Sequence, residues 1–134
     1  MIKIGIVGSR IYIDKKKVEE VVDQCIKKYG AENICIISGG AIGADTLGKI
    51  AALEKKLKYI EYNPAHTTYN EYSGKPKEFY GKSYKVQNFF ERNSFIAEDS
   101  DLLIAFIPKG HQSNGTMDTI EKMKKLNKPY FIID

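Results

Sequence analysis

Short runs of apolar, mostly β-branched residues alternate along this chain with stretches in which apolar residues recur every three or four positions. Runs of the first kind predict strands that are buried on both faces. They cover residues 2–7, 33–37, 58–62, 102–106 and 130–133. Stretches of the second kind predict amphipathic helices, because that spacing places apolar side chains on one face. They cover residues 14–29, 44–57, 86–97 and 116–126.

Local signals mark several helix ends. Asp14 is a good N-cap for the first helix, Gly30 stops it, and Thr116 is the expected N-cap of the last helix. The spacing also predicts which side chains face the core. In the last two helices these are Val86, Phe89, Phe90, Ile96, Ala97, Met117, Ile120, Met123 and Leu126.

Strict alternation of strand and helix predicts an α/β fold with a parallel sheet covered on both faces. Right-handed crossovers make such a five-stranded sheet doubly wound, and the 134 residues form one domain, residues 1–134. Sheets of this kind bind ligands at the carboxyl ends of the strands, where the winding direction reverses. We therefore look for chemistry in the loops at that edge.

Composition agrees with a soluble globular protein, since 43% of residues are hydrophobic and 28% are charged. No apolar run is long enough for a membrane span, and the N-terminus lacks a signal-peptide pattern. Cys25 and Cys35 fit no metal or redox spacing and are expected to be buried, reduced thiols, which favours a cytoplasmic setting. The net charge of +4 comes from dispersed lysines and permits a polyanionic partner without requiring one.

Three loops at the carboxyl edge have the composition of anion-binding turns. Gly8-Ser9-Arg10 follows the first strand, a glycine-rich turn from Ser38 to Asp45 follows the second, and Ser113-Asn114-Gly115-Thr116 follows the fourth. Two of them open helices, whose free N–H groups and positive dipole end favour a phosphate. The predicted ligand-binding residues here are Gly8, Ser9, Arg10, Ser38, Gly39, Gly40, Gly43, Asp45, Ser113, Asn114, Gly115 and Thr116. The alternative is that the glycines only form tight strand-to-helix turns. Asp45 has two interpretations: it satisfies the helix N-terminus, or it binds a ribose hydroxyl or anchors the loop.

Two further features could contribute. Arg92 and Asn93 lie on a largely apolar helix and need partners if they face inward. The alternative is that they point to solvent or bind a neighbouring carboxylate. Residues 63–85 form a long segment without periodicity, in which tyrosines alternate with lysines. Such a composition suits a nucleobase or a nucleic-acid strand. The alternative is that its aromatic residues attach the segment to the core or to another subunit.

Other chemistry is not indicated. His66 and His111 are isolated, no metal-ligand spacing occurs, and Ser9 and Ser38 lack the context of a nucleophile. Asp45 and Asp118 are the remaining candidates for acid–base catalysis.

Together these loops resemble the SLOG superfamily, the Rossmann-like group named after Smf/DprA and the LOG enzymes, and within it the YspA/YpsA-related branch. The resemblance rests on Val7–Arg10, Ser38–Asp45, Tyr80-Gly81-Lys82, Arg92-Asn93 before Ser100–Phe106, and Ser113–Ile120. It implies a Rossmann-like sheet and a nucleotide-type ligand held by the glycine loops. Members of the superfamily bind single-stranded DNA or nucleotides, or cleave nucleoside monophosphates, and they often form homo-oligomers.

One departure from the cleaving LOG enzymes bears on function. Arg92 is present, but Thr119 occupies the position of their catalytic Glu, and Ser113-Asn114 replaces their double glycine. A hydroxyl cannot act as the carboxylate acid or base that N-glycosidic cleavage would use. We therefore expect a nucleotide-binding module, for a ligand of the ADP-ribose, NAD or nucleoside-phosphate type, that requires no cofactor or metal. In it Arg10 and Arg92 would supply charge to the bound ligand, and Asn93, Asp45 and Thr119 would orient its sugar or the loop. The alternatives are a nucleotide N-glycosidase that uses Asp45 or Asp118, and a DprA-like protein that binds single-stranded DNA.

Overall fold

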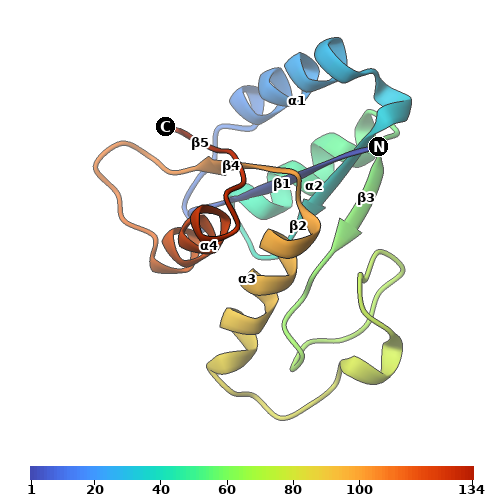
Figure 1. The fold of residues 1–134 in the computed structure, drawn as a ribbon, viewed down its shortest axis with the longest axis vertical. Coiled ribbons are helices and arrows are strands. Elements are labelled where there is room, and N and C mark those ends of the chain that lie inside the picture. Colours follow the sequence, from blue (N-terminus) through green and yellow to red (C-terminus); the bar gives the residue numbers. More distant parts are fainter.

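The computed structural model describes all 134 residues as one α/β domain (Figure 1). Five parallel strands form a single sheet in the order β3-β2-β1-β4-β5. The strands are β1 (Ile2–Gly8), β2 (Ile34–Ser38), β3 (Lys58–Glu61), β4 (Leu102–Phe106) and β5 (Tyr130–Ile133). The helices are α1 (Lys15–Tyr29), α2 (Ala44–Glu54), α3 (Gln87–Asp99) and α4 (Asn114–Lys125). The predicted doubly wound, five-stranded fold is confirmed.

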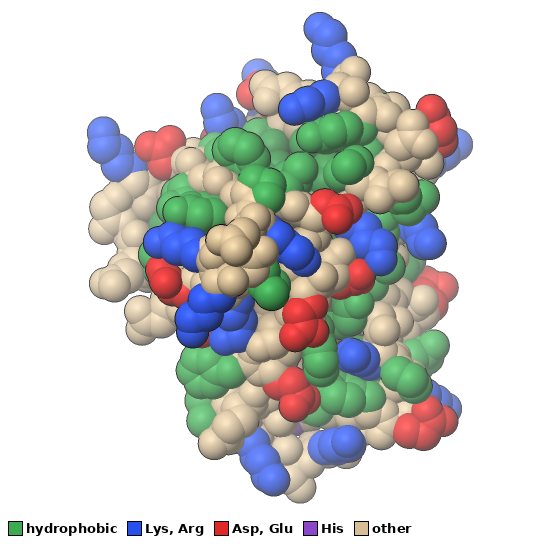
Figure 2. Space-filling view, viewed as in Figure 1, with side chains coloured by type: hydrophobic (Ala, Val, Ile, Leu, Met, Phe, Trp, Pro, Cys, Tyr) green, Lys and Arg blue, Asp and Glu red, His purple; other side chains and the backbone are tan.

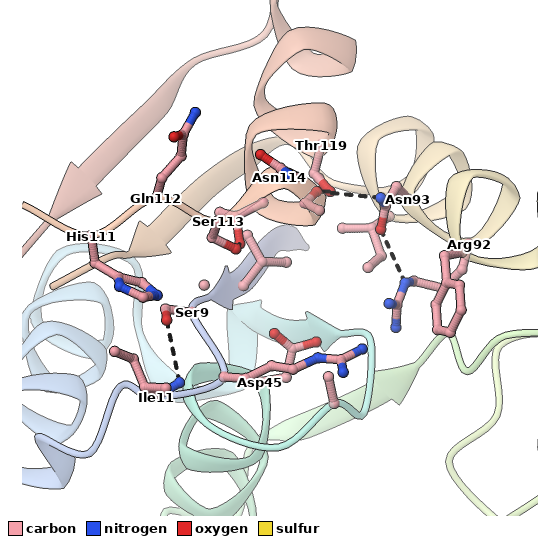
Figure 3. A pocket seen from close by; sticks show the side chains of 18 residues that line it. Ser9, Ile11, Asp45, Arg92, Asn93, His111, Gln112, Ser113, Asn114 and Thr119 are labelled. Carbon is pink, nitrogen blue, oxygen red and sulfur yellow. Dashed lines mark hydrogen bonds between the residues drawn. The ribbon is translucent and has the colours of Figure 1, made fainter. Parts of the chain in front are cut away.

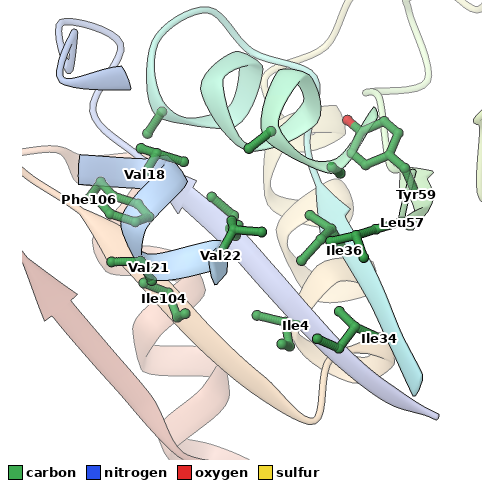
Figure 4. Close-up of a cluster of buried hydrophobic side chains, with 14 of the residues drawn as sticks. Ile4, Val18, Val21, Val22, Ile34, Ile36, Leu57, Tyr59, Ile104 and Phe106 are labelled. Carbon is green, nitrogen blue, oxygen red and sulfur yellow. The ribbon is translucent and has the colours of Figure 1, made fainter. Parts of the chain in front are cut away.

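Two hydrophobic cores lie on opposite faces of the sheet. On one face, Val18 and Val22 of α1 and Ala51 of α2 pack against Ile4, Ile36 and other strand residues (Figure 4). On the other face, Ile96 of α3 and Ile120 and Met123 of α4 pack against Cys35, Ile37 and Leu103. Because the chain winds outward from β1 in both directions, the carboxyl ends of β1 and β4 form the switch point at which such folds bind ligands.

The residues predicted to begin and end the first helix do so in the structure, but the predicted N-cap of the last helix does not. Asp14 caps α1 by accepting a hydrogen bond from the Lys17 N–H at 3.0 Å, and Gly30 ends it with a φ of 89°. The last helix begins at Asn114, two residues before the predicted start, with Ser113 at the N-cap. Thr116 therefore lies inside the first turn and is buried there, so its predicted capping role is wrong.

Three side chains predicted to face the core are exposed. Val86 is 53% exposed and Phe90 48%, because the amino-terminal part of α3 extends beyond the sheet (Figure 1). Leu126 is 44% exposed because it follows the last turn of α4. Of the two cysteines, only Cys35 is fully buried, and both are free thiols.

The long segment 63–85 is folded onto the domain. It contains a short 3-10 helix, Lys77–Phe79, and an isolated bridge that pairs Ser73 with Glu61. Two of its aromatic rings pack against the domain, Phe79 against Phe95 of α3 and Tyr72 against Tyr59 of β3, whereas Tyr69 and Tyr84 are exposed. These contacts agree with the interpretation that the aromatic residues attach the segment to the core.

Charged side chains are interspersed on the face shown in Figure 2, where lysines lie among acidic residues rather than in one basic patch. None of the helices is both long enough and apolar enough to span a bilayer.

Candidate functional site

A cavity of about 340 Å³ opens at the switch point (Figure 3). Its walls come from the loop after β1, the start of α2, the inward face of α3, and the loop and first turns after β4. Its volume lies within the range of small-molecule sites. Most of the residues predicted to bind a ligand line it, namely Gly8, Ser9, Arg10, Asp45, Arg92, Asn93, Ser113, Asn114, Gly115, Thr116 and Thr119. Ser38, Gly39, Gly40 and Gly43 do not.

The amino end of α4 faces this cavity without a side-chain cap. The first intrahelical hydrogen bond runs from the Met117 N–H to the Ser113 carbonyl, and Ser113 makes no capping bond to the backbone. Its hydroxyl instead pairs with that of Thr116 at 2.7 Å. The N–H groups of Asn114, Gly115 and Thr116 therefore have no partner within the helix, and all three residues line the cavity. This end also carries the positive end of the helix dipole.

Arg10 supplies a positive charge on the opposite wall. Its side chain is exposed, and no ion pair of the chain involves it. The neighbouring Ser9 is buried, and its carbonyl accepts hydrogen bonds from the N–H groups of Tyr12 and Ala44. These bonds join the β1 loop to the start of α2 and hold Arg10 at the edge of the cavity.

Gly39, in the glycine-rich turn after β2, does not line the cavity but is held by two residues that do. Asp45 Oδ2 accepts a hydrogen bond from the Gly39 N–H at 2.9 Å, and Arg92 Nη1 donates to the Gly39 carbonyl at 2.7 Å. A Cβ at Gly39 would collide with Arg92 Nη1 and lie 2.8 Å from Asp45 Oδ2. Glycine is thus needed here for the close approach of these two side chains.

Asp45 contributes the only carboxylate among the cavity-lining residues. It is 5% exposed, and burial raises its pKa from 3.8 to about 6 even though the charge of Arg92 and the hydrogen bonds from the Gly39 and Ala41 backbone lower it. Burial lowers the pKa of Arg92, an effect that the charge of Asp45 opposes. A titratable group so perturbed inside a cavity is typical of functional sites.

Asn93 and Thr119 hold the first turn of α4. Asn93 Nδ2 donates to the Gly115 carbonyl at 3.3 Å and to Asp118 Oδ2 at 3.1 Å, and the Thr119 hydroxyl donates to the Gly115 carbonyl at 3.2 Å. Asp118 also pairs with Lys122 at 2.9 Å. Asp118 is not among the residues that line the cavity.

Several lining residues were not predicted from the sequence. They include Ile11, Ala41, Phe89, His111 and Gln112. His111 and Gln112 are exposed and belong to the loop between β4 and α4 (Figure 3). Their position directly before Ser113 is the one signal that could have identified them. By contrast, no residue of segment 63–85 lines the cavity, so its tyrosines do not form a wall of this site as the sequence suggested.

Comparisons with known proteins agree with this architecture. The chain matches solved structures of DNA processing protein A (DprA) from Streptococcus pneumoniae, with 23% identity and a TM-score of 0.75, and from Helicobacter pylori, with 23% identity and a TM-score of 0.71. The protein TM1055 matches with 18% identity and a TM-score of 0.67. At these identities the likeness establishes the fold.

The matched regions differ in how much of each relative they cover. The alignments include 100%, 98% and 97% of this chain, but 50%, 64% and 72% of the respective structures. The chain thus spans about half the length of the streptococcal protein. No curated protein sequence matches it. Residues 1–74 match the family model described as DNA recombination-mediator protein A. The chain therefore belongs to the DNA recombination-mediator protein A family, within the SLOG superfamily.

Proposed function

We propose that this domain binds the phosphate of a nucleotide in the cavity at the switch point and acts as a binding module or sensor. The ligand class that we favour is a nucleoside phosphate or a nucleotide of the ADP-ribose or NAD type. Binding requires neither a metal nor a second cofactor in this proposal.

The observation that carries the proposal is the uncapped amino end of α4. Three backbone N–H groups without helical partners belong to Asn114, Gly115 and Thr116, which line the same cavity as Arg10. Backbone amides at a helix N-terminus together with an arginine form a favourable site for a phosphate group. Phe89, on the α3 wall, offers an aromatic face for the base.

The same geometry offers little for catalysis. Thr119 carries a hydroxyl that already donates to the Gly115 carbonyl, and Asp118 is engaged by Asn93 and Lys122. Asp45 remains the one carboxylate in the cavity, and one of its oxygens accepts from Gly39. The competing function, an N-glycosidase, would use Asp45 and would release free base from a nucleoside monophosphate. Absence of that release from the wild type and from Asp45→Asn alike would support the binding module.

Calorimetric titration with AMP, other nucleoside monophosphates, ADP-ribose, cyclic ADP-ribose and NAD tests the proposal. Arg10→Gln should weaken binding about tenfold, because it removes a charge-assisted contact to phosphate. Lys109→Gln is the matched control, since Lys109 is exposed, does not line the cavity, and changes the net charge by the same amount. No binding of any of these ligands at millimolar concentration would refute the small-nucleotide proposal.

Single-stranded DNA is the second candidate ligand, and family membership favours it. The Helicobacter pylori relative is described by its single-stranded DNA binding mode. In this version a backbone phosphate of the strand would occupy the cavity. Its affinity for an oligothymidine should fall steeply between 50 and 200 mM salt, because each neutralised phosphate releases counterions. Fluorescence anisotropy at several salt concentrations separates it from binding of a single nucleotide.

Membership of the YspA/YpsA-related branch and homo-oligomerisation remain predictions. Sedimentation of the purified domain would test the second.

A further inference from the structure

A buried chain of hydrogen bonds lies beside the turn after β2, outside the cavity. The Ser38 and Tyr59 hydroxyls are 2.5 Å apart, and the Tyr59 hydroxyl donates to Glu61 Oε1 at 2.7 Å. Asn70, in segment 63–85, donates to Glu61 Oε2 at 2.6 Å. Ser38, Tyr59 and Glu61 are all less than 9% exposed, and none of these residues lines the cavity.

The hydrogen bonds of this buried chain all run in one direction, from donor to acceptor towards Glu61. A tyrosine hydroxyl carries a single proton, and that of Tyr59 is donated to Glu61, so Ser38 must donate to Tyr59. The Ser38 oxygen is then free to accept from the Gly40 N–H, which lies 3.4 Å away. Successive bonds of one direction that end on a charged group strengthen one another.

Glu61 is well suited to end this chain. Burial pushes its pKa upward, but hydrogen bonds from Tyr59 and Asn70 and the charge of Lys49 outweigh burial and hold the pKa below its usual value. Lys49 Nζ, on α2, lies 3.3 Å from Glu61 Oε1. The carboxylate therefore stays ionised and tied to β3, α2 and segment 63–85 at once.

The turn thus has two supports. Gly39 is held by Asp45 and Arg92 from the cavity, and Gly40 by the Ser38–Tyr59–Glu61 chain from the other side. We propose that Tyr59 is a positioning residue for the cavity: its hydroxyl holds the Gly39–Gly40 turn in the place that aligns Arg92 and Asp45, and Asn70 connects segment 63–85 to the same chain. The expected effect of Tyr59 on ligand affinity rests on the proposed function, whereas its expected effect on the position of the turn does not.

Tyr59→Phe tests it by removing one hydroxyl while keeping the ring. Tyr72→Phe is the matched control, because the Tyr72 ring packs edge-on against that of Tyr59 at 5.4 Å and its hydroxyl has no place in the chain. In Tyr59→Phe, hydrogen exchange at the Gly40 amide should accelerate about fivefold, the factor that corresponds to one hydrogen bond. The NMR signal of Arg92 Nε–H, which donates to Asn93 Oδ1 at 3.0 Å, should also shift. Neither change is expected in Tyr72→Phe.

Affinity gives the third measurement. The dissociation constant for AMP should rise about fivefold in Tyr59→Phe and stay within twofold of the wild type in Tyr72→Phe. A variant that only loosened the fold would raise exchange throughout the sheet rather than at Gly40.

Two results would overturn the inference: equal Gly40 exchange and equal Arg92 signals in the two variants, or an unchanged AMP affinity in Tyr59→Phe when the wild type binds AMP. If the wild type does not bind AMP, the binding proposal fails for this ligand, and the Gly40 and Arg92 signals alone decide the positioning role. Ser38→Ala removes the same link from its other end and replaces Tyr59→Phe in all three measurements if that variant does not fold.

Discussion

Two strand-to-helix turns of the same sheet edge, after β2 and after β4, both contain glycine and other small residues but are organised in opposite ways. In the β2–α2 turn, both polar groups of the Gly39 peptide are bonded to side chains and the Gly40 N–H faces Ser38. In the β4–α4 turn, the first N–H groups of the helix lack helical partners and face the cavity. The first turn is closed by the protein itself, whereas the second is open to a ligand.

This difference separates two reasons for a glycine in a strand-to-helix connection. At Gly39 any side chain would occupy the space of Arg92 and Asp45. At Gly115 a Cβ would meet no atom within 4 Å. Glycine-rich composition alone therefore does not identify an anion site. What matters is whether the N–H groups are already bonded.

The largest expected difference is in stability. Gly39→Ala should destabilise the fold by about 3 kcal/mol, because the new methyl group forces apart two side chains that are held by hydrogen bonds. Urea unfolding followed by circular dichroism measures the change. A loss below about 1 kcal/mol would show that Arg92 and Asp45 can move aside, and that the turn is not closed in the sense argued above.

The sequence predicted the fold well because the fold depends on local periodicity. Short apolar runs rich in β-branched residues, such as residues 34–37, favour buried strands, and their alternation with helices favours a parallel sheet. The convergence of the β1, α2 and β4 loops at one cavity followed from that topology. The exposed Phe90 was mispredicted because periodicity reports a helix face, but not how far the helix extends beyond the sheet.

The hydrogen-bond partners of the residues in the site could not be predicted from the sequence. Arg92 was expected to provide charge for a ligand, yet one of its nitrogens binds the carbonyl of Gly39, 53 positions earlier. The buried chain from Asn70 to Ser38 joins residues whose types are common on surfaces. Bonds of this kind depend on distances of a few tenths of an ångström between distant segments, and no short sequence pattern encodes them.

A second prediction concerns Asp45, the acid that closes the β2 turn. Its folded-state pKa of about 6 exceeds the ordinary value of 3.8, so the folded protein keeps a proton that the unfolded chain loses. The contribution of Asp45 to stability is therefore largest below pH 4, falls as pH rises from 4 to 6, and is constant above; the shift corresponds to about 3 kcal/mol.

Asp45→Asn removes this ionisation and retains an oxygen that can accept from Gly39. It should be more stable than the wild type by about 2 kcal/mol at pH 8 and equal to it near pH 4. Urea unfolding at both pH values measures the difference. A variant that is less stable than the wild type at pH 8 but equal to it near pH 4 would mean that the charged carboxylate stabilises the turn by more than its burial costs.

The smallest effect is expected in the open turn. Gly115→Ala should leave stability unchanged or raise it by up to about 1 kcal/mol, because alanine is the better helix former and its methyl group meets no atom. This change in stability has the opposite sign to the change expected for Gly39→Ala. The same methyl group stands beside the free N–H groups of α4, so AMP should bind several-fold more weakly although the fold is at least as stable. Urea unfolding and calorimetry on the one variant measure both quantities. Weaker AMP binding without loss of stability is what an open, ligand-facing turn requires, and unchanged binding would place the phosphate elsewhere on the sheet edge.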